Sequence, residues 1–552
     1  MDSSRPCLQM PLCRGVEIEE LSITQLQNHL EKARFLSRDL TECYLKRIEL
    51  INPRIKAVIE ANPDSLGIAD ELDSERKNGH IRSQIHGIPF LVKDNISTKD
   101  KMQTTAGCAA LEGTIVPHDA HVVTLLRAAG GILLGKANLS EWASMRASYY
   151  AEGYSSRGGQ NRNPYNLAEH PGGSSSGSAS AVAANMCAFS IGTETDGSVM
   201  FPADRCAVVG IKPTVGLTST LGVIPEAPSL DTVGTFGRSV EDVAIVLNII
   251  AHKSATTGSQ PHAVRPSVDV SSIERPFTSW LANTSALKGV RFGLPQKRIW
   301  DTARESQEHK AEHIALEHLF KRLQEAGTLI LEVDFPSAEE IIAPDGWDWE
   351  YGDGETGSKL SEFEVVKTEF YRSLPKYLSS LRSNKNQILS LEDVIAYNIK
   401  HTNQDGGVPG THPAWPTGQD NFDRCVQSKY TDDSVYTKAL EYIIRKSRHE
   451  GIDAALRHEE GILDGLLVPL QADGGAACSL AAKAGYPMIA IPVGVSEIGV
   501  PFGIGIIQTA WREDLLVKYG SAIEGLIGYR HRPTFKNFDA DNYPYIGNPS
   551  KK

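Results

Sequence analysis

Two serines in glycine-rich segments are the residues of this chain best suited to nucleophilic chemistry. Ser174 lies in the run PGGSSSG, Ser198 closes the run GTETDGS, and Lys93 stands well upstream in GIPFLVKDN. A serine hydroxyl becomes nucleophilic only beside a base, and a lysine can be that base only if burial keeps it neutral at working pH. The set therefore predicts a serine hydrolase whose base is a lysine and not a histidine.

The turn that leads into Ser198 is suited to binding an oxyanion. Thr195 and Asp196 precede Gly197, and a turn of this kind can point successive backbone N–H groups at one place. Runs rich in glycine and serine are often flexible linkers, but both runs here are embedded between apolar segments. We therefore interpret them as active-site loops.

Other motif matches indicate different chemistry. Residues 173–177 also fit the Gly-x-Ser-x-Gly nucleophile elbow centred on Ser175, although a run of glycine and serine meets that pattern by chance. Residues 130–136 fit part of a phosphate loop, but Ala137 replaces the hydroxyl that would hold magnesium. The histidines and cysteines show no metal-ligand spacing, so no metal and no cofactor are expected.

Helical and strand-like segments alternate around these motifs. Helices are predicted over 37–51 (ending at Asn52–Pro53), 121–129, 178–185 and 307–326, and strands over 57–60, 132–134, 289–294, 329–333, 466–469 and 488–495. A helix between strands is typical of an α/β fold.

Shifts in composition predict the organisation of the chain. We expect an arm over 1–16, one domain over 17–545 and a tail over 546–552. The core halves are predicted at about 80–250 and at 288–336 plus 460–530, joined by a polar surface connection over 252–276. An insertion over about 340–430, rich in tryptophan and Gly/Pro loops, is predicted to cover the substrate site.

Charge and cysteine usage limit the partners and the location. A net charge of −12 without a basic stripe disfavours a nucleic-acid partner, and no apolar run is long enough for a membrane span. The eight cysteines are scattered, and the first residues lack the apolar centre of a signal peptide. A cytoplasmic protein is predicted.

The order of motifs resembles the amidase signature family, and within it the bacterial peptide amidases. The matching segments are 171–177, 192–198, 202–203 and 209–217, with further likeness at 135–143, 157–160, 163–165, 418–420 and 484–487. The resemblance covers nearly the whole chain and is lowest in the insertion. It implies one large α/β domain with a central mixed, twisted sheet covered by helices on both faces.

The resemblance also assigns roles to the site residues. It implies a Ser-cisSer-Lys triad in which Ser198 is the nucleophile, Ser174 the bridging serine and Lys93 the base. The backbone N–H groups of the oxyanion hole would be those of Thr195, Asp196, Gly197 and Ser198. The implied reaction is hydrolysis of a carboxamide through an acyl-enzyme, with release of ammonia or an amine.

The substrate is predicted from less specific signals. Aromatic and apolar residues near the site, namely Trp142, Tyr149, Tyr150, Tyr154 and Met200, would form a wide cleft for a C-terminal peptide amide or another hydrophobic or aryl amide. The same aromatic residues are equally suited to the core. Asp204 and Arg205 depart from the family pattern, and we expect them to pair with each other, the alternative being that Arg205 reaches the substrate.

Two other functions stay open. A glutamine-dependent amidotransferase A-type subunit would need a partner chain, whereas the variant Glu-Thr-Asp in GTETDGS resembles amidases that act alone. An acyl-transferring or biosynthetic relative would use the same acyl-enzyme. No obligate partner subunit is expected, and the substrate is expected to be a small-molecule or peptide amide.

Overall fold

The computed structural model describes residues 8–251, 275–353, 360–459, 461–540 and 545–546. Its centre is one sheet of eleven strands in the order β1-β3-β2-β6-β8-β7-β16-β17-β15-β9-β10. The strands are β1 (Val58–Ala61), β2 (Pro89–Lys93), β3 (Ile132–Ala137), β6 (Phe189–Glu194), β7 (Val209–Lys212), β8 (Thr232–Gly237), β9 (Arg291–Pro295), β10 (Leu329–Val333), β15 (Gly465–Pro469), β16 (Met488–Val495) and β17 (Pro501–Ile507). This large mixed sheet confirms the predicted α/β class.

The sheet is mixed because parallel pairs flank an antiparallel centre. β2 pairs in parallel with β3 and β6, and β9 pairs in parallel with β10 and β15. The strands from β8 to β17 pair antiparallel with their neighbours. Every residue of β2, β3, β6, β7, β8, β15 and β17 is buried, which requires covering layers on both faces.

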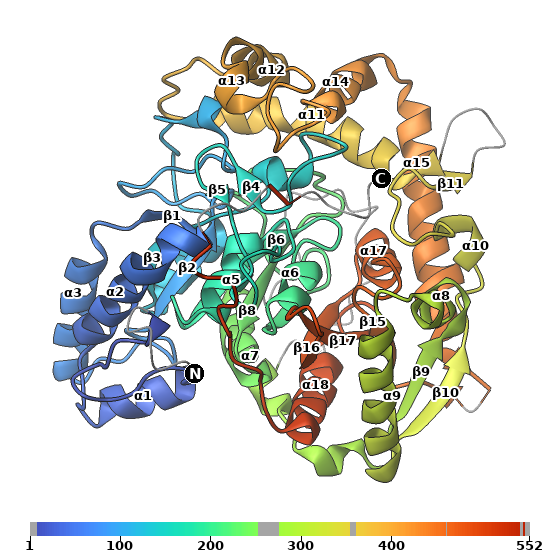
Figure 1. Cartoon of the computed structure of the whole chain (residues 1–552), viewed down its shortest axis with the longest axis horizontal. Helices are drawn as coiled ribbons and strands as arrows, with labels where there is room; N and C mark the ends of the chain where they lie inside the picture. The colour runs from blue at the N-terminus through green and yellow to red at the C-terminus, as the bar shows by residue number, and fades with distance from the viewer. Residues whose placement is uncertain (1–7, 252–274, 354–359, 460, 541–544, 547–552) are drawn as a thin grey trace.

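Helices supply those layers (Figure 1). In the first half they are α1 (Ile23–Glu31), α2 (Ser37–Ile55), α3 (Ser65–Lys77), α4 (His121–Ala128), α5 (Ser176–Ala183), α6 (Met200–Arg205) and α7 (Val240–Ile250). In the second half they are α8 (Asp301–Glu305), α9 (Lys310–Glu325), α10 (Ala338–Ile341), α15 (Asp433–Ser447), α16 (Asp453–Ala455), α17 (Ala476–Ala484) and α18 (Glu513–Ile527). Helix α5 packs on β2, β3 and β6, and α7 and α18 pack on the central strands.

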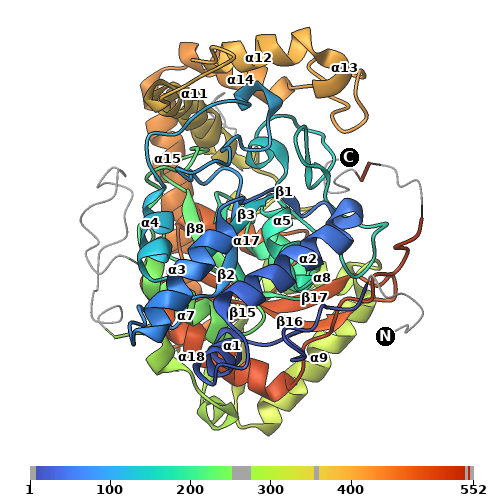
Figure 2. The ribbon, with the colours of Figure 1, turned by 90° about the vertical axis from the view of Figure 1, so that its left-hand side faces the viewer.

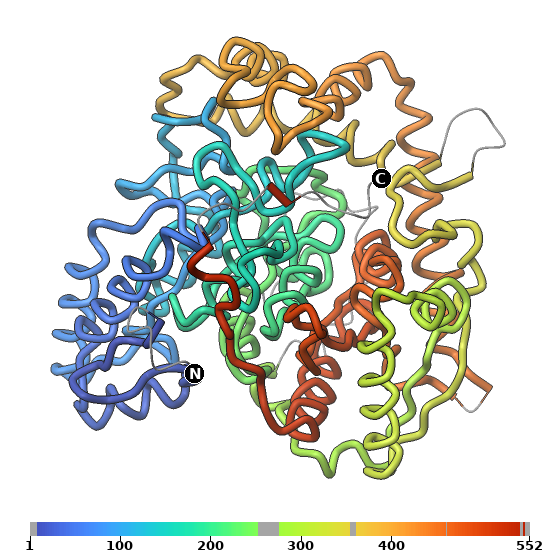
Figure 3. The backbone as a smooth tube through the Cα atoms, viewed as in Figure 1, coloured from blue at the N-terminus to red at the C-terminus, as the bar shows by residue number. Residues whose placement is uncertain are grey.

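A separate group of helices lies at one end of the molecule. It comprises α11 (Glu362–Ser380), α12 (Leu391–Lys400), α13 (Thr402–Asp405) and α14 (Asp420–Gln427). Figures 2 and 3 show this group beyond one end of the strands, where it continues into α15. Small antiparallel pairs, β4 (Tyr154–Ser155) with β5 (Gly159–Gln160), β11 (Gly352–Asp353) with β12 (Leu360–Ser361) and β13 (Arg457–His458) with β14 (Gly461–Ile462), complete the described strands.

One predicted boundary is wrong. Helix α2 does not stop at Asn52–Pro53 but continues to Ile55, and it ends at Lys56 in the left-handed region (φ 56°). Pro53 lies in the last turn, where its missing N–H removes a single helical hydrogen bond. Ile51 and Ile55 are both fully buried, so packing on the core outweighs the local preference of the residue before proline.

Most other predicted elements are present within three residues of their expected bounds, and the strands predicted at 329–333 and 488–495 have the same bounds as β10 and β16. Helix α5 begins at Ser176, immediately after Ser174 and Ser175. The predicted connection over 252–276 lies almost wholly outside the described residues, as do parts of the predicted arm and tail.

Candidate active site

Two neighbouring parallel strands of the sheet, β2 and β6, place Lys93 beside Ser174 and Ser198. Lys93 is the last residue of β2, and the paired strand β6 ends at Glu194. The stacked rings of Phe90 and Phe189, with centroids 5.1 Å apart, pack these strands together. In α/β sheets, ligand sites form at the carboxyl ends of the parallel strands. Lys93 and the loop after β6, which carries Ser198, both lie at this end.

The lysine and both serines form one hydrogen-bonded line. Lys93 Nζ lies 2.8 Å from Ser174 Oγ, and Ser174 Oγ lies 2.8 Å from Ser198 Oγ. Lys93 Nζ also donates to Thr193 Oγ1 at 2.9 Å and to the Thr193 carbonyl at 3.2 Å. The peptide bond between Gly173 and Ser174 is cis. The structure therefore brings together the three residues that the motifs singled out.

Lys93 is in the state that a base needs. Its side chain is fully buried, and this burial lowers the pKa of the lysine to about 7, whereas ionisation of the neighbouring buried carboxyl groups, Glu226 first, acts in the opposite direction. A lysine with such a pKa is substantially neutral at physiological pH. Its nitrogen can then accept a proton from Ser174.

The turn from Thr195 to Ser198 presents unused backbone donors. No described residue accepts a hydrogen bond from the backbone N–H of Thr195, Asp196, Gly197 or Ser198. Gly197 has φ 73°, a conformation that favours glycine. The carboxylate of Glu194 accepts the N–H groups of Val199 at 2.6 Å and Met200 at 3.0 Å. These two hydrogen bonds join the residue before the turn to the residues after it. Such a turn can stabilise an oxyanion.

Ser175 has a different environment from its neighbour. Its hydroxyl donates to the Thr193 carbonyl at 3.0 Å and accepts from the Thr193 N–H at 3.3 Å, while its N–H donates to the Ser198 carbonyl at 3.2 Å. The side chain is fully buried and is not among those that line the cavity. Ser175 thus joins the two loops, which disfavours the nucleophile-elbow alternative.

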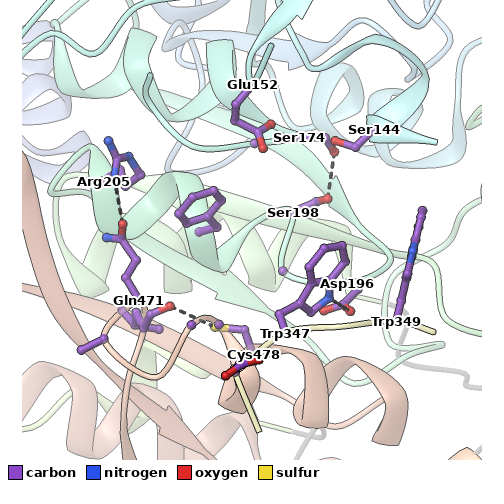
Figure 4. Close-up of a pocket in the computed structure, with 18 of the residues that line it drawn as sticks. Ser144, Glu152, Ser174, Asp196, Ser198, Arg205, Trp347, Trp349, Gln471 and Cys478 are labelled. Atoms are coloured by element: carbon purple, nitrogen blue, oxygen red, sulfur yellow. Dashed lines mark hydrogen bonds between the residues drawn. The ribbon is translucent and has the colours of Figure 1, made fainter. Parts of the chain in front are cut away.

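The serine pair opens into a cavity of about 580 Å³. Figure 4 shows Ser174 and Ser198 in its middle, Arg205 and Gln471 at one end and Trp347 and Trp349 at the other. The cavity is also lined by carboxyl groups from several segments, including Glu152, Glu226, Glu305, Glu308 and Glu362. The cavity therefore combines these carboxyl groups with apolar and aromatic side chains such as Phe201 and Trp347.

Only one of the predicted substrate-binding aromatic residues, Tyr150, lines this cavity. Trp142 is in the core, edge-on to Phe370 and Phe422. Three further residues of that prediction lie elsewhere: Tyr154 packs against Trp415, the Tyr149 N–H donates to Thr417 Oγ1, and Met200 is fully buried in α6.

The expected pairing of Asp204 with Arg205 is wrong. Arg205 forms an ion pair with Glu169 at 3.3 Å and donates to the His170 carbonyl at 3.0 Å and to Gln471 Oε1 at 2.9 Å. Asp204 instead accepts from the amide of Gln471, and burial raises the pKa of its carboxyl well above the ordinary value. Successive residues of a helix point in different directions, so the side chains of neighbours on α6 do not face each other.

Several cavity residues were not predicted from the sequence. Gln471 follows the carboxyl end of β15. Its place just after a predicted strand was the one signal that could have indicated a site residue. Glu152 accepts from the hydroxyl of Ser140 and from Tyr150 at 3.3 Å, beside Gly173. Nothing in the local sequence distinguishes Glu152 or Glu226 from surface glutamates.

The described residues contain no group of three His, Cys, Asp or Glu side chains arranged to hold a metal ion. Among the described helices, none combines the length and the apolar character needed to cross a bilayer. Seven cysteines are described, and all of them are free thiols.

Comparison with known proteins identifies the family. Residues 39–404 match the family model for amidase. The chain belongs to the amidase family. A Schizosaccharomyces pombe protein named "Putative amidase C869.01" is 45% identical over 549 residues, covering 97% of this chain and 90% of that protein. The predicted resemblance and the predicted enzyme class, an amide hydrolase, are confirmed.

Two further relatives of this amidase-family chain bear on its function. The crystal structure of peptide amidase from Stenotrophomonas maltophilia matches with a TM-score of 0.79 at 36% identity, covering 94% of this chain and 99% of that chain. The A-type subunit of glutamyl-tRNA(Gln) amidotransferase from Acinetobacter baumannii is 32% identical over 511 residues, covering 91% of this chain and 95% of that protein. The structural match confirms the predicted single large domain with a mixed sheet between helices.

Proposed function

We propose that this amidase hydrolyses a carboxamide, such as a C-terminal peptide amide or another hydrophobic or aryl amide, through an acyl-enzyme on Ser198. The observation that carries the proposal is the unbroken line of hydrogen bonds from Lys93 through Ser174 to Ser198, next to a turn with unused N–H groups. The cavity gives an amide access to Ser198.

The geometry supports a two-proton relay for acylation. Ser198 Oγ attacks the amide carbonyl carbon as its proton passes to Ser174, whose own proton passes to neutral Lys93. The carbonyl oxygen becomes an oxyanion beside the N–H groups of residues 195–198. Lys93 then returns a proton through Ser174 to the leaving nitrogen, the C–N bond breaks, and ammonia or an amine departs.

Deacylation uses the same line in the same order. Water attacks the ester carbon while Ser198 Oγ is still esterified, and the water proton passes through Ser174 to Lys93. Collapse of the second tetrahedral intermediate breaks the ester bond, and Ser198 Oγ regains its proton by the reverse route. The free acid leaves, and the starting hydrogen-bond line is restored.

Labelling with a fluorophosphonate tests the nucleophile. Intact-mass and peptide-mapping analysis should place one label on Ser198, and Ser198→Ala should abolish both the label and ammonia release from an amidated dipeptide. Ser175→Ala is the matched control, because it removes the adjacent hydroxyl and leaves the proposed relay in place. A label on Ser175, or an active Ser198→Ala enzyme, would contradict the proposal.

The pH dependence tests the base. Because the lysine must be neutral to accept a proton, kcat should rise with pH through about 7, the pKa of buried Lys93. A profile that is flat between pH 5 and pH 8, a window of roughly three units around that value, would argue against a lysine base.

The likeness to an A-type amidotransferase subunit favours a second candidate, glutamine-dependent amide transfer with a partner chain. Hydrolysis of free glutamine in preference to a peptide amide, together with a copurifying second chain, would support it. We retain the predictions of a cytoplasmic location and of activity without a partner chain, and size-exclusion chromatography of the active enzyme tests the latter.

A further inference from the structure

The hydroxyl of Thr195, at the start of the oxyanion turn, lies between two buried carboxyl groups. Thr195 Oγ1 is 2.6 Å from Asp231 Oδ1 and 2.9 Å from Glu226 Oε2. Both distances are those of hydrogen bonds. A hydroxyl has one proton, so it can donate to only one of the two carboxyl groups.

The surroundings decide which carboxyl receives that proton. Asp231 also accepts the backbone N–H of Glu226 at 3.0 Å and that of Ala227 at 3.0 Å, which favours its charged form. The carboxyl of Glu226, in contrast, contacts the Thr195 hydroxyl beside the charge of Asp231. Two charged carboxylates cannot both face one hydroxyl oxygen at these distances, so Glu226 must carry a proton and donate it to Thr195 Oγ1.

Burial supports this protonation state. Glu226 is 8% exposed, and burial together with the nearby charge of Asp231 raises the pKa of the glutamate to about 8. The direction of donation is therefore from Glu226 to Thr195 and from Thr195 to Asp231 at neutral pH.

We propose that Glu226 is a positioning residue that acts as a neutral carboxylic acid, holding the Thr195 hydroxyl and thereby the first N–H donor of the oxyanion turn. The inference rests on the proposed acyl-enzyme function of this site. It assigns Glu226 a role in catalysis without contact to the reacting atoms.

The proton on Glu226 also affects the charge of Lys93, the proposed base. Glu226 is the first of the carboxyl groups whose charge favours the protonated form of Lys93. An ionised Glu226 would therefore hold the lysine charged and unable to accept a proton, in addition to repelling Asp231. A neutral Glu226 leaves both the turn and the base in their working states.

Other groups also face this carboxyl. They are Asp231 on the same loop, Lys93 on β2, Asp196 on the turn, Cys425 on α14 and, facing Asp231, Glu369 on α11. Burial raises the pKa of the Cys425 thiol, and burial also raises the pKa of Glu369, so neither adds a positive charge that would favour ionisation of Glu226. The positive group in this set is Lys93, which loses its charge through about pH 7, before Glu226 ionises.

The expected result is a narrow pH window for the wild-type enzyme. Activity should rise as Lys93 loses its proton through about 7 and fall as Glu226 loses its proton through about 8. Glu226→Gln keeps a neutral donor at this position at every pH. It should retain most of the activity at pH 7 and lose the alkaline fall.

Two further variants separate positioning from folding. Glu226→Ala removes the donor and should lower kcat about 10²-fold, the scale of a displaced catalytic group, with KM changed by less than about twofold. Thr195→Val removes the shared hydroxyl and should lower kcat similarly, while adding Glu226→Ala to it should cost little more. Wild-type kcat in Glu226→Ala, or an alkaline fall that persists in Glu226→Gln, would overturn the proposal.

Infrared spectroscopy makes the test independent of activity. The difference spectrum of wild type minus Glu226→Gln at pH 7 should contain the carbonyl band of a protonated carboxylic acid, and this band should fade as the pH rises through about 8. Absence of the band would overturn the inference even in an active enzyme. If no amide is hydrolysed but the band is present, the proposed function fails and the protonated Glu226 stands.

Discussion

The two walls of the cavity are built in different ways. One wall comes from a continuous part of the chain: Ser174 and Ser198 lie on loops that flank α5 and β6, and the buried Lys93 at the end of β2 lies behind them. The other wall comes from distant parts: Trp347 and Trp349 precede α11, His309 precedes α9, and Gln471 follows β15. Short motifs fix the first wall, and long-range packing fixes the second.

The difference lies in what holds each side chain. Lys93 is positioned by a residue of the neighbouring strand, since its nitrogen donates to the backbone carbonyl and to the side-chain hydroxyl of Thr193. Trp347, in contrast, comes from a distant part of the chain, and its indole donates to Asp196 Oδ2 at 2.5 Å. We therefore expect changes in the first wall to affect the chemical step and changes in the second to affect positioning and binding.

The largest effect should come from the first wall. Lys93→Ala, Ser174→Ala and Ser198→Ala should each lower kcat by roughly 10⁴- to 10⁶-fold, because the three groups act as one unit. The double variant Lys93→Ala/Ser198→Ala should be about as impaired as the worse single variant. Steady-state release of ammonia measures this, and additive losses would contradict a single relay.

A connection between the core and the end helices should give the next largest effect. Arg146 is buried, pairs with Glu141 at 2.5 Å, donates to the Asp405 carbonyl and stacks on Trp415. Arg146→Met leaves Glu141 buried without its partner and should lower the free energy of unfolding by about 3 to 5 kcal/mol.

Urea titration followed by tryptophan fluorescence measures that loss. The double variant Arg146→Met/Glu141→Gln removes both charges and should recover part of it, because no unpaired charge is then buried. A loss below about 1 kcal/mol in the single variant, typical of an exposed pair, would mean that the pair is of little importance.

The hydrogen bond from Trp347 to Asp196 tests whether the second wall positions the turn. Trp347→Phe removes the donor to the Asp196 carboxylate and should lower kcat about tenfold, the effect of one lost hydrogen bond to a charged group. Trp349→Phe is the matched control, because its ring packs on Phe363 with centroids 4.7 Å apart. Equal kcat values in the two variants would show that the Trp347 bond does not position the turn.

The smallest effect is expected at Arg205, where the two walls meet. Arg205→Lys keeps the positive charge but loses the planar fork that holds the His170 carbonyl and Gln471. KM for amidated dipeptides should rise by about two- to fivefold, within the range of a partly exposed ion pair, with kcat unchanged. A change in kcat alone would place Arg205 with the reacting groups instead.

The sequence predicted three residues that the structure brings together, but not the groups opposite them. Ser174, Ser198 and Lys93 could be predicted as a set because short motifs in the sequence mark them. Trp142 and Met200 were expected at the substrate but are in the core, since an apolar side chain does not reveal what it packs against. The protonation of Glu226 depends on Asp231 and on burial, and no local pattern reports either one.

In the fold, too, some features follow from the local sequence and others from tertiary contacts. The strand at 488–495 has the predicted bounds because its apolar run is itself the signal, whereas α2 continues past Pro53 because Ile55 packs in the core. Local signals therefore predicted where elements occur, and tertiary contacts decided where one helix ended and which charged groups paired.

The line from Lys93 to Ser198 contains no aromatic ring. Each member ends in a group that rotates about a single bond, and neighbouring heavy atoms lie 2.8 Å apart at both links. In the proposed mechanism, reversing the direction of proton transfer within each half-reaction needs only hydroxyl rotation, with no tautomer change and no swing of a side chain. The resting arrangement of Lys93, Ser174 and Ser198 can thus serve proton transfer in either direction of the proposed relay, and between these three groups only protons need to move.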